Sequence, residues 1–67
     1  MLYICAMKTI ISNALDGNLI LERDDEISSA KYYTIEGVVY QHMMDIMRIE
    51  KNAIVKEIIV IKTKLLP

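Results

Sequence analysis

An apolar stripe at helical spacing runs through the middle of the chain. Starting from Ile35, apolar side chains and His42 recur at steps of three and four residues, and polar residues recur at the same steps on the opposite side. The apolar set is Ile35, Val38, Val39, His42, Met43, Ile46 and Met47, and the polar set is Thr34, Gly37, Gln41, Asp45 and Arg48. Two complementary stripes in one window predict an amphipathic α-helix from about Ser28 to Ile49.

The segments on either side of this window have the composition of strands. Residues 2–11 and 53–65 are rich in Ile, Val and Leu and have no helical period, and residues 19–23 form a shorter apolar run. Asp16-Gly17 lies between two of these runs and favours a type I′ hairpin turn with Leu19 opposite Ala14. We therefore expect one α+β domain over residues 1–67: a β-hairpin, a helix and a β-strand. One long amphipathic helix then covers one face of a three-stranded antiparallel or mixed sheet.

Residues 31–40 also allow a different fold. The run KYYTIEGVVY has high strand propensity, and Gly37 could mark a bulge, which gives a small all-β barrel of five short strands. In that alternative, Val38 to His42 resembles the Tyr-Lys-His segment of Hfq and other Sm-like RNA-binding proteins. The match covers only these residues, and their spacing from the Asp16-Gly17 turn is too short, so no function is transferred. The apolar stripe continues past Tyr40, which favours the helix.

The composition indicates self-association. The chain has 67 residues, of which 54% are hydrophobic, and its mean hydropathy is +0.29. A chain of this size buries only about 60% of its unfolded surface. Cys5 and His42 are the only cysteine and histidine, which excludes an internal disulfide and a Cys/His zinc site within one chain. We therefore expect a homodimer or higher oligomer. One face of the last strand offers the candidate self-association residues Ile54, Ile58 and Val60.

Candidate catalytic groups are sparse. The chain lacks a Gly-rich phosphate loop, a nucleophile elbow and a paired metal motif. Asp45 could orient His42 as a general base, but a histidine packed at an interface is the commoner arrangement. Asp24-Asp25-Glu26 fits a helix start better than a cation site. We expect no enzymatic activity, no cofactor and no metal.

The surface that the apolar stripe leaves uncovered is the candidate binding surface. Tyr33, Tyr40 and Met44 lie outside the stripe, and exposed tyrosine and methionine are favoured at protein interfaces. A nucleic-acid-binding dimer that uses these tyrosines and a basic C-terminal strand is the alternative. The net charge of −1 gives no overall attraction to nucleic acid.

These patterns favour a small, non-enzymatic, homo-oligomeric protein that acts by protein–protein interaction. A regulator or inhibitor of the kind encoded by mobile elements fits the size. No apolar run is long enough for a transmembrane helix, and Met1 to Met7 lacks the basic start of a signal peptide. We therefore expect a cytoplasmic protein that does not bind membranes.

Overall fold

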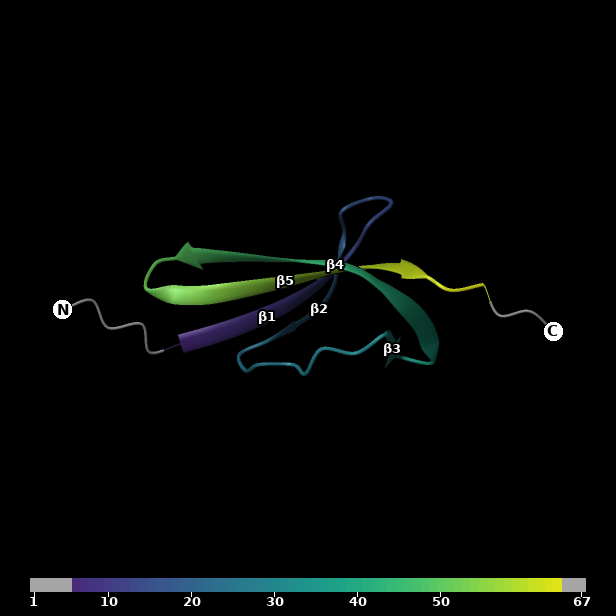
Figure 1. Ribbon diagram of the computed structural model, residues 1–67, viewed down its shortest axis with the longest axis horizontal. Helices are drawn as coiled ribbons and strands as arrows, with labels where there is room; N and C mark the ends of the chain where they lie inside the picture. The colour runs from purple at the N-terminus through teal and green to yellow at the C-terminus, as the bar shows by residue number, and fades with distance from the viewer. Residues whose placement is uncertain (1–5, 65–67) are drawn as a thin grey trace.

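The computed structural model describes residues 6–64. Over these residues the structure is all-β, and five strands form a nearly closed, barrel-like sheet (Figure 1). The strands are β1 (Ala6–Asn13), β2 (Leu19–Arg23), β3 (Tyr32–Ile35), β4 (Val38–Glu50) and β5 (Ala53–Lys62). Their order across the sheet is β2-β1-β5-β4-β3. Neighbours are antiparallel except β1 and β5, which are parallel.

The predicted helix over residues 28–49 is wrong. The predicted α+β class with a three-stranded sheet is therefore also wrong. Strands β3 and β4 occupy most of this segment, joined by a turn at Glu36-Gly37. Both turn residues have left-handed backbone, with φ of 50° and 77°, as a two-residue type I′ turn requires. Ile35 therefore pairs with Val38. The small all-β barrel, which was the alternative, agrees with this structure.

The helical period misled because β4 carries apolar side chains on both faces. In a strand, odd and even residues point to opposite faces. When both sets contain Val, Ile and Met, steps of three and four also land on apolar residues. Near-continuous apolar runs of this kind cannot separate strand from helix by periodicity alone. The strand propensity of Val38 to Tyr40 was the better guide.

The flanking strands were predicted, but β1 extends to Asn13, two residues past the predicted end at Ile11, and the first turn differs. Strand β2 has the predicted bounds, and β5 lies within predicted residues 53–65; residues 2–5 of the predicted first strand lie outside the described residues. The Asp16-Gly17 hairpin has a longer loop than a type I′ turn. Only Gly17 is left-handed there, with φ of 73°, and its N–H donates to the Asn13 carbonyl at 2.8 Å. Consequently Leu19 pairs with Ser12 rather than Ala14.

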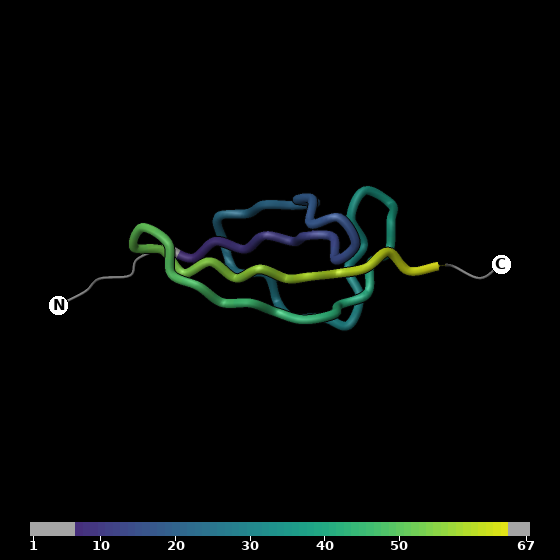
Figure 2. The backbone as a smooth tube through the Cα atoms, turned by 90° about the horizontal axis from the view of Figure 1, so that it is seen from above, coloured from purple at the N-terminus to yellow at the C-terminus, as the bar shows by residue number. Residues whose placement is uncertain are grey.

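A third turn joins β4 directly to β5. Lys51 and Asn52 have φ of 48° and 65°, so they form a two-residue turn that pairs Glu50 with Ala53. Asparagine tolerates this left-handed conformation, which suits it to such a turn. The resulting β4–β5 hairpin is the longest antiparallel pair in the sheet, and its two strands lie side by side along the molecule (Figure 2).

The core lies on one face of the sheet, which we call the inner face. Its buried cluster is Ile11, Tyr33, Ile58 and Val60. The connection between β2 and β3 crosses next to this face and is anchored by side chains from it. The Thr9 hydroxyl donates to the Asp25 carbonyl at 2.8 Å, and the Lys56 ammonium donates to the Ser29 hydroxyl at 3.0 Å. The opposite side is the outer face.

Replacing Gly37 tests the turn against the helix. A Cβ at Gly37 would meet no atom within 4 Å, so Gly37→Ala adds only the backbone cost of a left-handed residue. We expect the free energy of unfolding to fall by about 1 kcal/mol in urea denaturation. A helical Gly37 would give the opposite sign, because alanine stabilises a helix interior. The matched variant Glu36→Asn should raise stability, since asparagine tolerates this conformation.

Candidate functional site

Among the described strands, none lies beside one edge of β4 over most of its length. Strand β3 pairs only with Val38 to Gln41, and the last contact on this side is the His42 N–H, which donates to the Lys31 carbonyl at 3.0 Å. On its other side β4 pairs with β5 from Tyr40 to Glu50. Within residues 6–64, the side of residues 43–50 away from β5 is therefore unpaired. We call residues 43–50 the β4 edge.

The β4–β5 turn determines which backbone groups of this edge are free. In a two-residue hairpin the flanking residues, here Glu50 and Ala53, exchange both hydrogen bonds. Along an antiparallel strand the bonding direction alternates with each residue. Arg48 and Ile46 therefore bond to β5. The N–H and C=O groups of Asp45, Met47 and Ile49 point away from β5 and can accept a further strand.

The side chains of the β4 edge are mostly apolar and exposed. Met43, Met44, Ile46, Met47 and Ile49 are exposed by 38–63%. They belong to both faces of the sheet, because Met47 and Ile49 share the inner-face register while Ile46 lies on the outer face. Soluble proteins usually protect an edge strand with lysine, proline or a covering segment. An unpaired edge with exposed apolar side chains has what strand addition needs: backbone hydrogen-bonding groups and surface to bury.

The three predicted partner-binding residues do not form one surface. Tyr33 is 8% exposed and belongs to the core, where its hydroxyl accepts a hydrogen bond from the Ala30 N–H at 3.0 Å. Tyr40 is half-buried opposite Tyr33 and packs against the same core. Met44 is exposed and lies on the β4 edge. Met44 is thus exposed to solvent, whereas the two tyrosines pack in or against the core.

The predicted self-association residues lie largely inside the chain's own core. Ile58 and Val60 are 0% exposed, and Ile54 is half-buried on the same face. Among the described residues, most of the exposed large hydrophobic side chains are instead on the neighbouring strand β4. Sequence reasoning missed Ile46, Met47 and Ile49 as surface residues because the helix placed the first two against the sheet. Their signal was the run of apolar residues at both odd and even positions.

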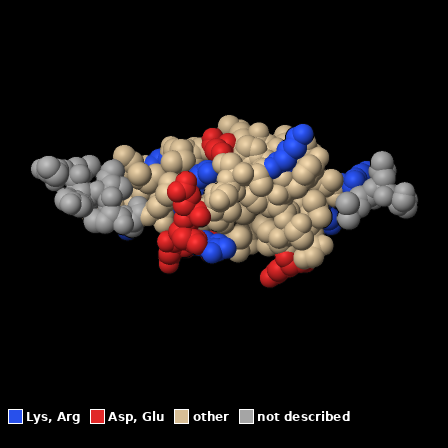
Figure 3. Space-filling model, turned by 60° about the horizontal axis from the view of Figure 1, so that its bottom comes forward, with Lys and Arg blue, Asp and Glu red and all other residues tan. Residues whose placement is uncertain are grey.

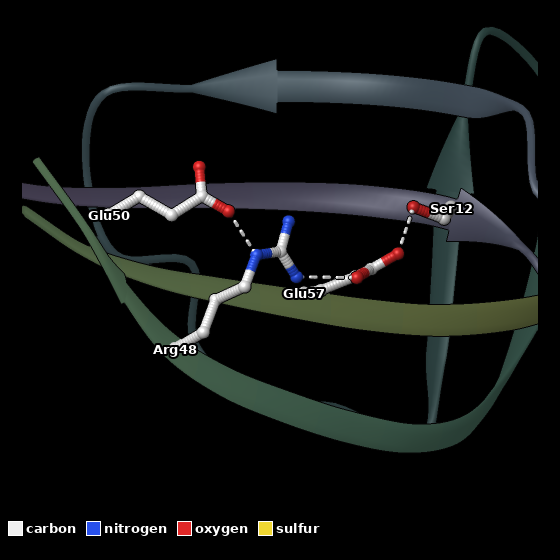
Figure 4. Close-up of polar contacts among 4 residues, drawn as sticks. All are labelled: Ser12, Arg48, Glu50 and Glu57. Atoms are coloured by element: carbon white, nitrogen blue, oxygen red, sulfur yellow. Dashed lines mark hydrogen bonds and ion pairs between the residues drawn. The ribbon is translucent and has the colours of Figure 1, made fainter.

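A polar network on the outer face ties the β4 edge to the sheet (Figure 4). Arg48 Nη1 donates to Glu57 Oε1 at 2.7 Å, and the Ser12 hydroxyl donates to Glu57 Oε2 at 2.8 Å. Arg48 Nε also donates to Glu50. The Arg48 guanidinium and then the Ser12 hydroxyl hold the pKa of the Glu57 carboxyl below its usual value. The network joins β1, β5 and β4, and it keeps Glu57 ionised.

His42 and Asp45 are brought together by a bulge in β4. The pairing with β5 shifts between His42 and Met44, and His42 Nε2 lies 2.7 Å from Asp45 Oδ1. The Tyr33 ring meets the imidazole edge to face, with centroids 6.4 Å apart. Within residues 6–64, no group of three or more His, Cys, Asp or Glu side chains is placed to hold a metal ion. The pair spans the bulge at the start of the β4 edge.

The basic residues of the C-terminal strand and its end, Lys56, Lys62 and Lys64, are dispersed. Lys56 is buried and donates to Ser29, whereas Lys62 and Lys64 are exposed near the end of β5. On the face drawn in Figure 3, basic and acidic atoms are interspersed among uncharged ones. A nucleic-acid surface needs clustered positive charge along a backbone path. The burial of Lys56 and Tyr33 removes two of the expected contacts from that surface.

Comparison with protein-family models, curated proteins and solved structures finds no match to this chain. In the part of the chain that the structure describes, no helix is long and apolar enough to cross a membrane.

The lowered pKa of Glu57 predicts a pH-dependent contribution to stability. A carboxyl whose folded pKa is lowered stabilises the fold above its ordinary value of 4.5, and this contribution is lost as the pH falls through the folded pKa. At pH 7, Glu57→Gln should reduce the free energy of unfolding by about 1 kcal/mol. The difference from wild type should shrink as the pH falls below 4.5. Urea denaturation at one protein concentration measures this. Glu36→Gln, in the exposed turn, is the control and should show no such trend.

Proposed function

We propose that this protein is a non-enzymatic homo-oligomer that acts through protein–protein contacts, and that the β4 edge holds its copies together. The observation that carries the proposal is the combination on residues 43–50 of an unpaired strand edge with five exposed apolar side chains. Such a strand left in water recruits another strand. The role of a small regulator or inhibitor is part of this proposal.

The balance between buried and exposed apolar residues supports self-association. Among the described residues, the buried hydrophobic ones are Ile11, Tyr33, Val55, Ile58 and Val60. Of the eight large hydrophobic residues that are exposed in the same part of the chain, five belong to the β4 edge. Each square ångström of apolar surface that association removes from water contributes about 25 cal/mol before the costs of association. A second copy would therefore bury the largest continuous group of exposed apolar residues on β4.

The state of the ionisable groups supports a non-enzymatic role. A general base needs a pKa near the working pH and a free site for the proton. Both carboxylate oxygens of Glu57 already accept hydrogen bonds, from Arg48 and Ser12. The lowered pKa of this carboxyl also makes it a weak base. The contact between His42 and Asp45 is one that could orient a base, but this proposal assigns it, like Glu57, to the architecture of β4.

Light scattering coupled to size-exclusion chromatography tests the proposal. We expect the wild-type protein to elute at twice the mass of one chain or more at micromolar concentration. Met47→Lys should yield a monomer, because it places two or more ammonium groups in a surface that must lose water.

Leu15→Lys is the matched control. Leu15 is 77% exposed in the β1–β2 loop, so the same change of charge and polarity there should leave the oligomer intact. A wild-type protein that stays monomeric at micromolar concentration would contradict the proposal. Loss of the oligomer in both variants would also count against a specific role of the β4 edge.

A further inference from the structure

We infer that two copies join antiparallel through β4, with Met47 on the two-fold axis, so that their sheets become one continuous sheet. This inference rests on the proposed self-association and specifies the second copy as the strand that occupies the β4 edge. Three features of the edge determine the register: where it begins and ends, which backbone groups are free, and where its charges lie.

Obstacles at the two ends of the β4 edge limit where the two-fold axis can lie. At one end, the contact between the His42 N–H and Lys31 occupies the space beside β4. At the other end, the Lys51-Asn52 turn ends the strand. Antiparallel pairing about Met47 sets Met44 opposite Glu50 of the second copy. Pairing about this residue therefore uses residues 44–50, all of the edge except Met43, and stops before either obstacle.

In this register the free backbone N–H and C=O groups of the two copies face each other. Asp45, Met47 and Ile49 carry the N–H and C=O groups that point away from β5. Pairing about Met47 sets the two Met47 residues opposite each other and Asp45 opposite Ile49 of the second copy. Residues that face each other in this way exchange N–H···O=C bonds in both directions. An axis between two residues would instead set free groups opposite groups that already bond to β5.

The charges disfavour the neighbouring registers. An axis at Arg48 sets its guanidinium directly opposite its own copy, and like charges opposite each other destabilise a sheet. An axis at Ile46 brings Glu50 of the second copy beside His42, where Lys31 already lies. Parallel in-register pairing sets Asp45 and Arg48 each opposite itself. In the Met47 register no charged residue lies directly opposite a like charge.

The side chains also fit this register. On the inner-face side the two Met47 side chains meet, with Ile49 as a diagonal neighbour, and methionine adapts to irregular apolar contacts. On the outer face Ile46 lies opposite Arg48 of the second copy. The guanidinium of Arg48 is held by Glu57 and Glu50, so its aliphatic stem is available to cover Ile46. Apolar surface is thus buried on both sides of the shared sheet.

Cysteine cross-linking tests the register. In a Cys5→Ser background, single variants Met47→Cys, Ile46→Cys and Leu15→Cys are oxidised in a glutathione buffer, and disulfide-linked dimer is measured against time. Only a residue on the two-fold axis lies directly opposite its own copy, at a Cα separation of about 5.5 Å that a disulfide accepts. We expect Met47→Cys to cross-link several-fold faster than the other two variants. Leu15→Cys reports random collision.

Amide hydrogen exchange by NMR tests the same register without a new thiol. In the wild-type protein, the amides of Asp45, Met47 and Ile49 should exchange slowly. In monomeric Met47→Lys, the amides of Asp45 and Ile49 should exchange many-fold faster. The amides of Ile46 and Arg48 bond to β5 and should stay slow in both proteins.

The outcomes separate this inference from the proposed function. Two results would overturn the Met47 register but leave self-association standing, provided that the wild-type protein is oligomeric. One is that the Ile46→Cys variant cross-links fastest, and the other is that the Met47 amide of the wild-type oligomer exchanges rapidly. A monomeric wild-type protein would overturn both. Preferred cross-linking at Met47 together with protection of alternate amides would establish the register.

Discussion

The pairing of β4 with β5 is the constraint on which the rest of the structure depends. The left-handed Lys51-Asn52 turn sets Glu50 opposite Ala53, and that single pairing determines the direction of each backbone group along β4. Slipping the register by one residue would move each side chain of β4 to the other face. The core contacts of Ile58, the outer-face ion pair of Arg48 and the free groups of Met47 all follow from this turn.

The sequence predicted strands β2 and β5 better than the structure of residues 28–49. Strands β2 and β5 are bounded by Asp24 and by the turn at Lys51-Asn52, so their ends are marked by local chemistry. Residues 28–49 have no such marks except Gly37, and glycine is compatible with a costly helix position or with a turn. The pairing with β5, a contact distant in sequence, decides between them. Residue propensities describe the local sequence and contain no information on that contact.

The candidate site was predicted only in part. Met44 was selected for the right property, exposure, because it lay outside the apolar stripe. Tyr33 was selected for the same reason, yet a buried tyrosine with a bonded hydroxyl has the same sequence signature as an exposed one. The expectation of self-association did not depend on the helix, since it came from the excess of apolar residues in a short chain. It stays a prediction, but the structure shifts its location from β5 to β4.

The outer-face network bears on why β4 could pair with a second copy instead of aggregating without order. An edge strand that frays must be ordered at the moment of association, and that ordering costs free energy. Arg48 bridges Glu50 on its own strand and Glu57 on β5, and Ser12 fixes Glu57 from β1. The edge is therefore held in an extended conformation before a second strand arrives. Asp45 and Arg48 flank Met47 with opposite signs. A strand that pairs about Arg48 therefore meets a like charge, and one that pairs about Ile46 meets the position that Lys31 occupies. Preorganisation and charge placement thus act on the same residues.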